Sequence, residues 1–159
     1  KEWDCDSISV DYFSELQRVT KNQIIFGANH FIDKLPIPSS CWIVWDKDNA
    51  ESFFADCELA WTSFPKAVRK FKWRWFGMLQ EQMGRYKEER VHPTQKPLEL
   101  MKWIIENYAN KDDLIFDPFL GSGTTAVAAK QLGRKYIGIE ISPKYVSIAE
   151  QRLRQDILL

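Results

Sequence analysis

The sequence predicts an α/β fold with a largely parallel sheet, and two stretches in its C-terminal half carry this prediction. Residues 114–125, Leu-Ile-Phe-Asp-Pro-Phe-Leu-Gly-Ser-Gly-Thr-Thr, indicate a short apolar strand, a glycine turn and the start of a helix. Residues 135–140, Lys-Tyr-Ile-Gly-Ile-Glu, indicate a second strand that ends in a carboxylate. Strands that alternate with helices in this way are typical of parallel sheets with helices packed on them.

The glycine turn indicates a small-molecule site, because ligands of α/β sheets bind beyond the carboxyl ends of strands and against a helix N-terminus. Asp117 ends the first strand and Glu140 follows the second, where a carboxylate is costly unless it meets a donor. The loop has neither the Gly-Lys-Ser/Thr of a P-loop nor the Gly-x-Gly-x-x-Gly of a pyrophosphate binder. A nucleoside cofactor without a diphosphate fits best, and S-adenosylmethionine is the leading candidate. The alternative is that Gly121 and Gly123 only serve the turn, since glycine reaches positive φ without a steric penalty.

Upstream of these stretches, apolar spacing predicts one helix and then a series of short strands. The helix covers residues 10–19, and a helical turn at 31–35 is stopped by Pro36 and Pro38. Strands are predicted at residues 23–26, 41–45, 58–61 and 70–76. We expect the last two to pair antiparallel, and residues 77–90 to form a loop.

Caps and apolar stripes predict three helices in the C-terminal half. Pro97 occupies the first turn of a helix whose apolar positions recur on one face. A second helix covers residues 124–132 and ends at Gly133. A third follows Ser142, a hydroxyl cap with Pro143 at the first helical position, and runs to about residue 155.

Length and composition indicate one globular domain, residues 1–159, with 45% apolar and 14% aromatic residues. No run reaches the roughly 18 apolar residues of a membrane span. The first residues do not form a signal peptide, so we expect a cytoplasmic protein without membrane contact. Cys5, Cys41 and Cys57 lie far apart and are expected to be reduced thiols. His30 and His92 lack metal-ligand spacing, so no metal site is expected.

The zero net charge conceals a basic segment, residues 64–90, with 8 Lys and Arg against 3 Asp and Glu. Aromatic residues alternate with these cations, a combination that suits contact with phosphates and exposed bases. A surface strand with buried rings and solvated cations explains the same pattern, and the two interpretations are compatible. The candidate DNA-contacting residues are Lys70, Lys72, Arg74, Arg85 and Lys87.

Residues 92–97, His-Pro-Thr-Gln-Lys-Pro, form a stiff lead-in to the predicted helix after Pro97. Together with Asp-Pro-Phe-Leu-Gly-Ser-Gly-Thr-Thr at 117–125, this segment resembles the amino-group DNA methyltransferases of the permuted β class. These enzymes use S-adenosylmethionine to methylate adenine N6 or cytosine N4. The resemblance extends over nearly the whole chain and implies a Rossmann-like methyltransferase sheet in circularly permuted order.

The resemblance also implies a role for each cofactor-binding candidate. Asp117 would accept from the methionine ammonium, and Glu140 from both ribose hydroxyls. Thr94 and Lys96 would hold the methionine carboxylate, with Lys96 as a point charge. The remaining candidates would line the cofactor: Phe119, Gly121, Ser122, Gly123, Thr124 and Ile141. Ordinary core packing remains the alternative for Phe119 and Ile141.

The chain departs from the family in its catalytic segment, Asp/Asn/Ser-Pro-Pro followed by an aromatic residue. Its seven prolines, at 36, 38, 65, 93, 97, 118 and 143, are never adjacent, so no catalytic residue is assigned. The central strand that carries the segment is expected to be missing between residues 114–117 and 23–26. In the family this segment holds the target amine and stacks on the flipped base.

Three hypotheses follow from this departure. In the first, the chain is part of a DNA methyltransferase whose catalytic segment lies outside this sequence. Adenine N6 is the favoured target of that enzyme. Alternatively the chain is a cofactor- or DNA-binding module without catalysis, or a small-molecule or protein methyltransferase. The expected partners are double-stranded DNA and a separate polypeptide that supplies the missing segment, and a homodimer is left open.

Overall fold

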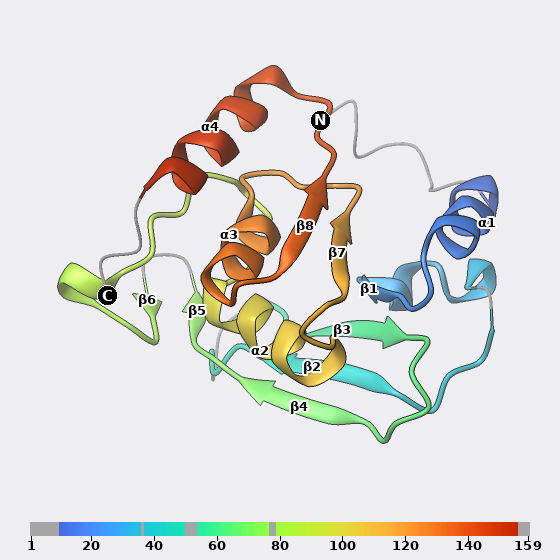
Figure 1. The fold of residues 1–159 in the computed structure, drawn as a ribbon. Helices are drawn as coiled ribbons and strands as arrows, with labels where there is room; N and C mark the ends of the chain where they lie inside the picture. Colours follow the sequence, from blue (N-terminus) through green and yellow to red (C-terminus); the bar gives the residue numbers. More distant parts are fainter. Residues whose placement is uncertain (1–9, 36, 50–53, 77–78, 156–159) are drawn as a thin grey trace. The chain divides into compact units, whose positions relative to one another are not determined.

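The computed structural model describes residues 10–35, 37–49, 54–76 and 79–155. These residues form two compact units, divided between Arg74 and Trp75, and each is described by itself (Figure 1). Cys41 and Cys57 form no disulfide within the described part of the chain, and Cys5 and Pro36 lie outside the described residues. None of the described helices has the length and apolar character needed to cross a membrane.

The first unit is built on a four-stranded sheet with the order β1-β3-β2-β4. β3 (Cys57–Thr62) lies antiparallel to both β1 (Ile24–Phe26) and β2 (Trp42–Asp46), and β4 (Arg69–Lys72) lies parallel to β2. The predicted antiparallel pair of β3 and β4 is therefore wrong, because β2 separates them. The expectation of a largely parallel sheet also fails for this unit.

Packing in the first unit follows the alternation of side chains along β2 and the buried C-terminal half of β3. Ile43 and Trp45 on β2 are fully buried, as are Ala60 and Trp61 on β3, whereas the intervening β2 side chains are only half-buried. The helix predicted at residues 10–19 is confirmed as α1 (Val10–Val19). Two short 3-10 helices, η2 (Ala28–His30) and η3 (Ile32–Lys34), follow β1.

The predicted strand at 70–76 is divided between the two units. β4 ends at Lys72, and β5 (Trp75–Phe76) pairs instead with β6 (Leu79–Gln80) in a small antiparallel hairpin. Part of the predicted loop at 77–90 is therefore regular, since it contains β6 and the 3-10 helix η4 (Gly84–Tyr86). Residues 77 and 78 lie outside the described residues.

The second unit contains the strand–helix–strand arrangement predicted from the two C-terminal stretches. β7 (Leu114–Asp117) and β8 (Lys135–Gly138) are parallel, and α3 (Thr124–Gln131) connects them. α2 (Leu98–Tyr108) packs against α3 through a small core formed by Ile105, Ala128 and Ala129. α4 (Pro143–Arg154) also contacts α3. These helices and strands confirm the predictions for the C-terminal half.

Ser142 does precede α4, but its side chain makes no capping hydrogen bond, so the predicted hydroxyl cap is wrong. Its backbone N–H instead donates to Glu140 Oε1 at 2.8 Å.

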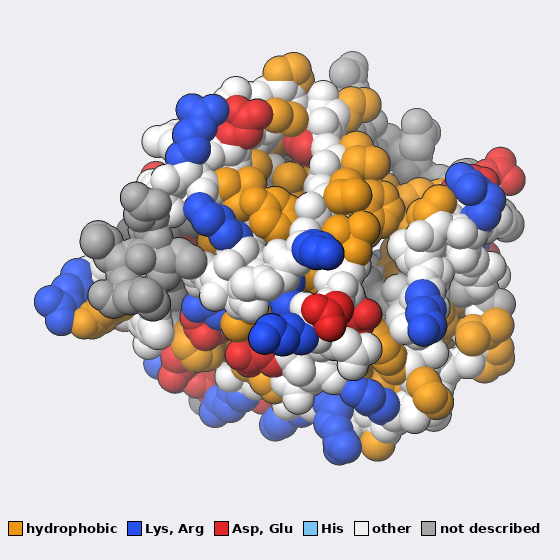
Figure 2. All heavy atoms as spheres, in the orientation of Figure 1, with side chains coloured by type: hydrophobic (Ala, Val, Ile, Leu, Met, Phe, Trp, Pro, Cys, Tyr) orange, Lys and Arg blue, Asp and Glu red, His pale blue; other side chains and the backbone are white. Residues whose placement is uncertain are grey.

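One face of the β7–β8 pair is open. Ile115 and Tyr136 pack toward α2 and α3, whereas Leu114, Ile137 and Ile139 are more than half exposed. Figure 2 shows hydrophobic side chains gathered over these two strands. A parallel sheet is ordinarily covered on both faces, and α2 and α3 of the second unit cover only the face that carries Ile115 and Tyr136.

Candidate functional site

Asp117 stands at the end of β7 and is held by two donors from the following turn. Its Oδ1 accepts from the Phe119 N–H at 3.0 Å, and its Oδ2 accepts from the Thr125 hydroxyl at 2.6 Å. These bonds offset the cost of half-burying a carboxylate. Each carboxylate oxygen has two lone pairs, so both oxygens can accept one further hydrogen bond.

The turn between β7 and α3 needs glycine at two positions. Gly121 has φ 54° and Gly123 has φ 85°, both in the left-handed region. The interpretation that these glycines serve the turn is therefore supported. At Gly123 space is also limiting, because a Cβ there would lie 2.8 Å from Ala149 Cβ on α4. The flanking Ser122 and Thr124 are buried.

Glu140 joins the end of β8 to the glycine turn. Its Oε2 accepts from the Gly121 N–H at 2.8 Å, and its Oε1 accepts from the Ser142 N–H at 2.8 Å. Because β7 and β8 are parallel, their carboxyl ends meet at one edge of the pair. Asp117 and Glu140 therefore stand on adjacent strand ends with the glycine turn between them.

The His-Pro-Thr-Gln-Lys-Pro segment lies beside the same turn. The His92 ring is 3.7 Å from the position that a Gly121 Cβ would take, and its centroid is 4.3 Å from that of Tyr145 on α4. Thr94 is exposed, and its N–H donates to His92 Nδ1 at 3.2 Å. Lys96 Nζ donates to the Thr94 carbonyl at 3.4 Å. The second unit thus brings both sequence motifs together.

Phe119 and Ile141 are surface residues in this structure. Phe119 is 64% exposed and Ile141 is 97% exposed. Each follows a strand-end carboxylate by one or two positions. Ordinary core packing, the alternative for both, does not fit these exposures.

Several residues that contact the site were not selected from the sequence. The Thr125 hydroxyl donates to Asp117. Its position as the second threonine after Gly-Ser-Gly could have indicated this contact from the sequence. Gln95 is buried and accepts from the Ser122 hydroxyl at 3.1 Å. Its position inside the segment 92–97 could have indicated from the sequence that Gln95 lies near the turn. Arg152 also reaches the turn, but nothing local in its sequence distinguishes it from the neighbouring Arg154.

The DNA-contacting candidates fall into two groups. Lys70, Lys72 and Arg74 belong to the first unit, where they form ion pairs with Asp46 and Asp48. Asp48 raises the pKa of Lys72, chiefly through a hydrogen bond. The cations are exposed while Phe71 and Trp73 are half-buried, as expected for a surface segment.

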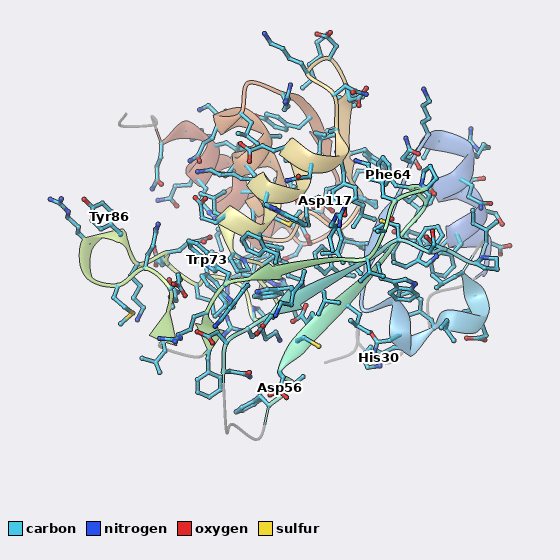
Figure 3. The ribbon with its side chains drawn as sticks, turned by 90° about the horizontal axis from the view of Figure 1, so that it is seen from below. His30, Asp56, Phe64, Trp73, Tyr86 and Asp117 are labelled. Atoms are coloured by element: carbon cyan, nitrogen blue, oxygen red, sulfur yellow. The ribbon has the colours of Figure 1, made fainter. Side chains whose placement is uncertain are left out.

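The second group, Arg85 and Lys87, belongs to the second unit. The Arg85 guanidinium lies 4.6 Å from the centre of the Tyr86 ring. Figure 3 shows Tyr86 at the tip of the η4 loop, and this side chain is 63% exposed. An exposed cation stacked on an exposed ring is suited to contact with a base or a phosphate.

Comparison with known proteins adds independent information on the family. A family model described as DNA methylase, N6_N4_Mtase, matches residues 46–151, which is more than half of the chain. The type II methyltransferase M2.MboI of Moraxella bovis is 36% identical over 120 residues, covering 74% of this chain and 42% of that protein. The type II methyltransferase M.HinfI of Haemophilus influenzae is 48% identical over 67 residues, covering 42% of this chain and 19% of that protein.

A solved structure is also similar. The crystal structure of the M1.HpyAVI–SAM complex shares 30% identity with a TM-score of 0.67, over 92% of this chain and 82% of that chain. In six curated relatives, the matched parts span 19% to 42% of the relatives' own length.

Proposed function

We propose that the chain takes part in S-adenosylmethionine-dependent methylation of DNA, because it belongs to the DNA methylase family. The family predicted from the two C-terminal motifs is thereby confirmed. The proposal extends the family's activity to this chain, which spans under half of the curated relatives that it matches. We propose adenine N6 as the target amine, with cytosine N4 as the alternative within the same family.

The observation that carries the proposal is the pair of carboxylates at the ends of two adjacent parallel strands, with a glycine turn between them. The cofactor presents an ammonium group at one end and a ribose diol near the other. Each oxygen of Asp117 and Glu140 already has a protein donor and retains a free lone pair. The donor and acceptor chemistry of these residues therefore fits S-adenosylmethionine.

We propose specific roles on this basis. Asp117 accepts from the ammonium, Glu140 accepts from the ribose hydroxyls, and Thr94 with Lys96 holds the carboxylate. The exposed side chains of Phe119 and Ile141 are available to cover the adenine. The backbone of Gly121, Ser122, Gly123 and Thr124 lines the centre of the site. When bound, the cofactor supplies the sulfonium methyl group that is transferred.

We further propose that the clamp for the target amine comes from outside this sequence, which contains no adjacent prolines. Within the described residues, β1 is an edge strand of its sheet and β7 pairs only with β8. We propose that a strand carrying the clamp pairs with the open edge of β7, next to the exposed apolar residues of the β7–β8 pair. Without the clamp, the amine is not aligned with the methyl group and the proximity effect is lost.

The experiment that tests this function measures two properties of one preparation. Calorimetry with S-adenosylmethionine is expected to show one site, weakened in Glu140→Ala. Transfer of labelled methyl to duplex DNA is then measured with and without a polypeptide that carries the family's Pro-Pro segment. Mass spectrometry of the digested DNA distinguishes N6-methyladenine from N4-methylcytosine.

Methylation only in the presence of the added polypeptide supports a partial or split methyltransferase. The missing proline pair also favours a second candidate, a binding module without catalysis. Cofactor binding without transfer under both conditions would support that second candidate. Absence of cofactor binding by the unmodified chain would contradict both the methyltransferase and the cofactor-binding module, and would leave only a DNA-binding module.

A further inference from the structure

A buried polar cluster lies behind the glycine turn, and none of its members has a role in the proposed cofactor contacts. It consists of Glu88, Gln95 and Arg152, which we call the Arg152 cluster. The side chains of Arg152 and Glu88 are only 16% and 21% exposed and form an ion pair at 3.1 Å. Burial raises the pKa of Glu88 and lowers the pKa of Arg152.

Arg152 fastens the turn on both sides of Gly123. One guanidinium nitrogen shares its two hydrogens among three acceptors, the Ser122 carbonyl at 2.8 Å and the Ser122 and Thr124 hydroxyls, each at 3.1 Å. The other donates to Glu88 at 3.1 Å. Gly123, between the two fastened residues, has the largest positive φ among the described residues. The guanidinium therefore contacts the residues on both sides of a backbone position in the left-handed region.

Gln95 and Glu88 connect this contact to the start of α2. Gln95 Oε1 accepts from the Ser122 hydroxyl at 3.1 Å, while its amide nitrogen donates to Glu88 Oε1 at 2.9 Å. Glu88 Oε2 accepts from the Leu98 N–H, the first residue of α2, at 2.9 Å. Gln80 binds the Glu88 backbone in two hydrogen bonds. The cluster thus joins the end of α4, the start of α2 and the turn.

A buried ion pair is weak evidence for stability, because desolvation of the two charges can exceed their attraction. The planar guanidinium is suited to fixed, multidentate geometry, since it holds its donors in a rigid fork. Most of the Arg152 bonds go to Ser122 and Thr124. This distribution points to control of the turn's conformation.

We propose that Arg152, supported by Glu88 and Gln95, is a positioning residue that holds residues 122–124 in the conformation that receives the cofactor. Cofactor affinity then depends on a side chain that does not touch the cofactor. The proposal rests on the proposed function for its ligand, but its effect on the turn exists in the free protein as well.

The test compares Arg152→Met with Arg154→Met, two positions further along α4. Arg154 is a matched control, because its side chain is 79% exposed and forms an ion pair with Glu150 on the helix surface. We expect Arg152→Met to weaken binding of S-adenosylhomocysteine at least tenfold, measured by calorimetry well below the unfolding midpoint. Arg154→Met should change the affinity less than twofold. Arg152→Lys keeps the positive charge but lacks the planar guanidinium, so it should weaken binding by an intermediate factor. This variant replaces Arg152→Met in the test if the Met variant does not fold.

Hydrogen exchange of the backbone amides at 121–125 in the free protein provides a second measurement. Exchange there should accelerate in Arg152→Met and Arg152→Lys and stay unchanged in Arg154→Met. Wild-type cofactor affinity in both Arg152 variants would overturn the proposal, and so would unchanged amide exchange at 121–125. A lowered unfolding midpoint with neither of the two expected changes would show that Arg152 only stabilises the fold. If the wild-type chain binds no cofactor, the proposed function fails, while the exchange measurement still decides whether Arg152 holds the turn.

Discussion

Replacement of Gly123 by alanine tests the geometry of the glycine turn more sharply than loss of any polar contact. The new methyl group meets two penalties. The first comes from φ 85°, a left-handed conformation that L-residues with a Cβ adopt at a cost of about 1–2 kcal/mol. The second comes from α4, because the Cβ would lie 2.8 Å from Ala149 Cβ and 3.1 Å from Ala149 Cα. Neither atom belongs to a flexible side chain, so the turn or the helix must move.

The two penalties can be separated with a matched control. Overpacking of a tight site costs about 1–3 kcal/mol, so Gly123→Ala should lower the free energy of unfolding by roughly 2–5 kcal/mol in total. Gly133 has φ 63°, and a Cβ there would meet nothing within 4 Å. Gly133→Ala should therefore show only the conformational cost of about 1–2 kcal/mol.

Urea denaturation of both variants measures these values, and calorimetry measures their cofactor affinity. We expect a clear excess destabilisation in Gly123→Ala and loss of cofactor binding only in that variant. Equal destabilisation of the two variants would refute the argument that α4 packs against the turn at Gly123. Retained cofactor affinity in Gly123→Ala would show that binding tolerates a shifted turn.

Three further predictions concern the carboxylates of the second unit. Glu140→Ala should weaken cofactor binding by roughly 1–3 kcal/mol, the usual cost of stranding hydrogen-bonding partners, and unchanged affinity by calorimetry would remove Glu140 from the site. Thr125→Val removes the donor to Asp117 Oδ2 and should cost about 0.5–1.5 kcal/mol in stability, measured by urea denaturation, with wild-type stability arguing against that bond. Glu88 holds its proton more tightly in the folded state because burial raises its pKa, even with Arg152 attached. Its contribution to stability should therefore be full below about pH 4.3 and decline as pH rises through the raised folded pKa. Glu88→Gln should remove this decline. Curves of unfolding free energy against pH that run parallel for the two proteins would contradict the attribution of the decline to Glu88.

The sequence predicted best those features that depend on neighbouring residues. The strand ending at Asp117, the glycine turn and α3 follow one another with local signals at each boundary: an apolar run, two glycines and two threonines. The start of α4 was predicted from an equally local signal, Pro143, although Ser142 makes no side-chain capping hydrogen bond.

Features that depend on distant residues were not predictable in the same way. The residues of β3 and β4 indicated strands but carried no information on their partners, and β2 lies between the two strands. The division of residues 70–76 between two sheets has the same origin, because β4 takes its place beside β2, where Lys72 pairs with the distant Asp46, whereas Trp75 pairs with Gln80. Arg152 and Glu88 are 64 residues apart in sequence, so their ion pair and the contact of Arg152 with the turn could be found only in the folded structure. The organisation of the chain as a single domain, the circular permutation and the roles of the site residues stay predictions.

A crystal structure of the chain with S-adenosylmethionine tests the central claim most directly. The account predicts the ribose hydroxyls within hydrogen-bond distance of the Glu140 carboxylate and the ammonium group at Asp117. A cofactor found at another place on the chain, or carboxylates of Asp117 and Glu140 that both point away from it, would contradict the account.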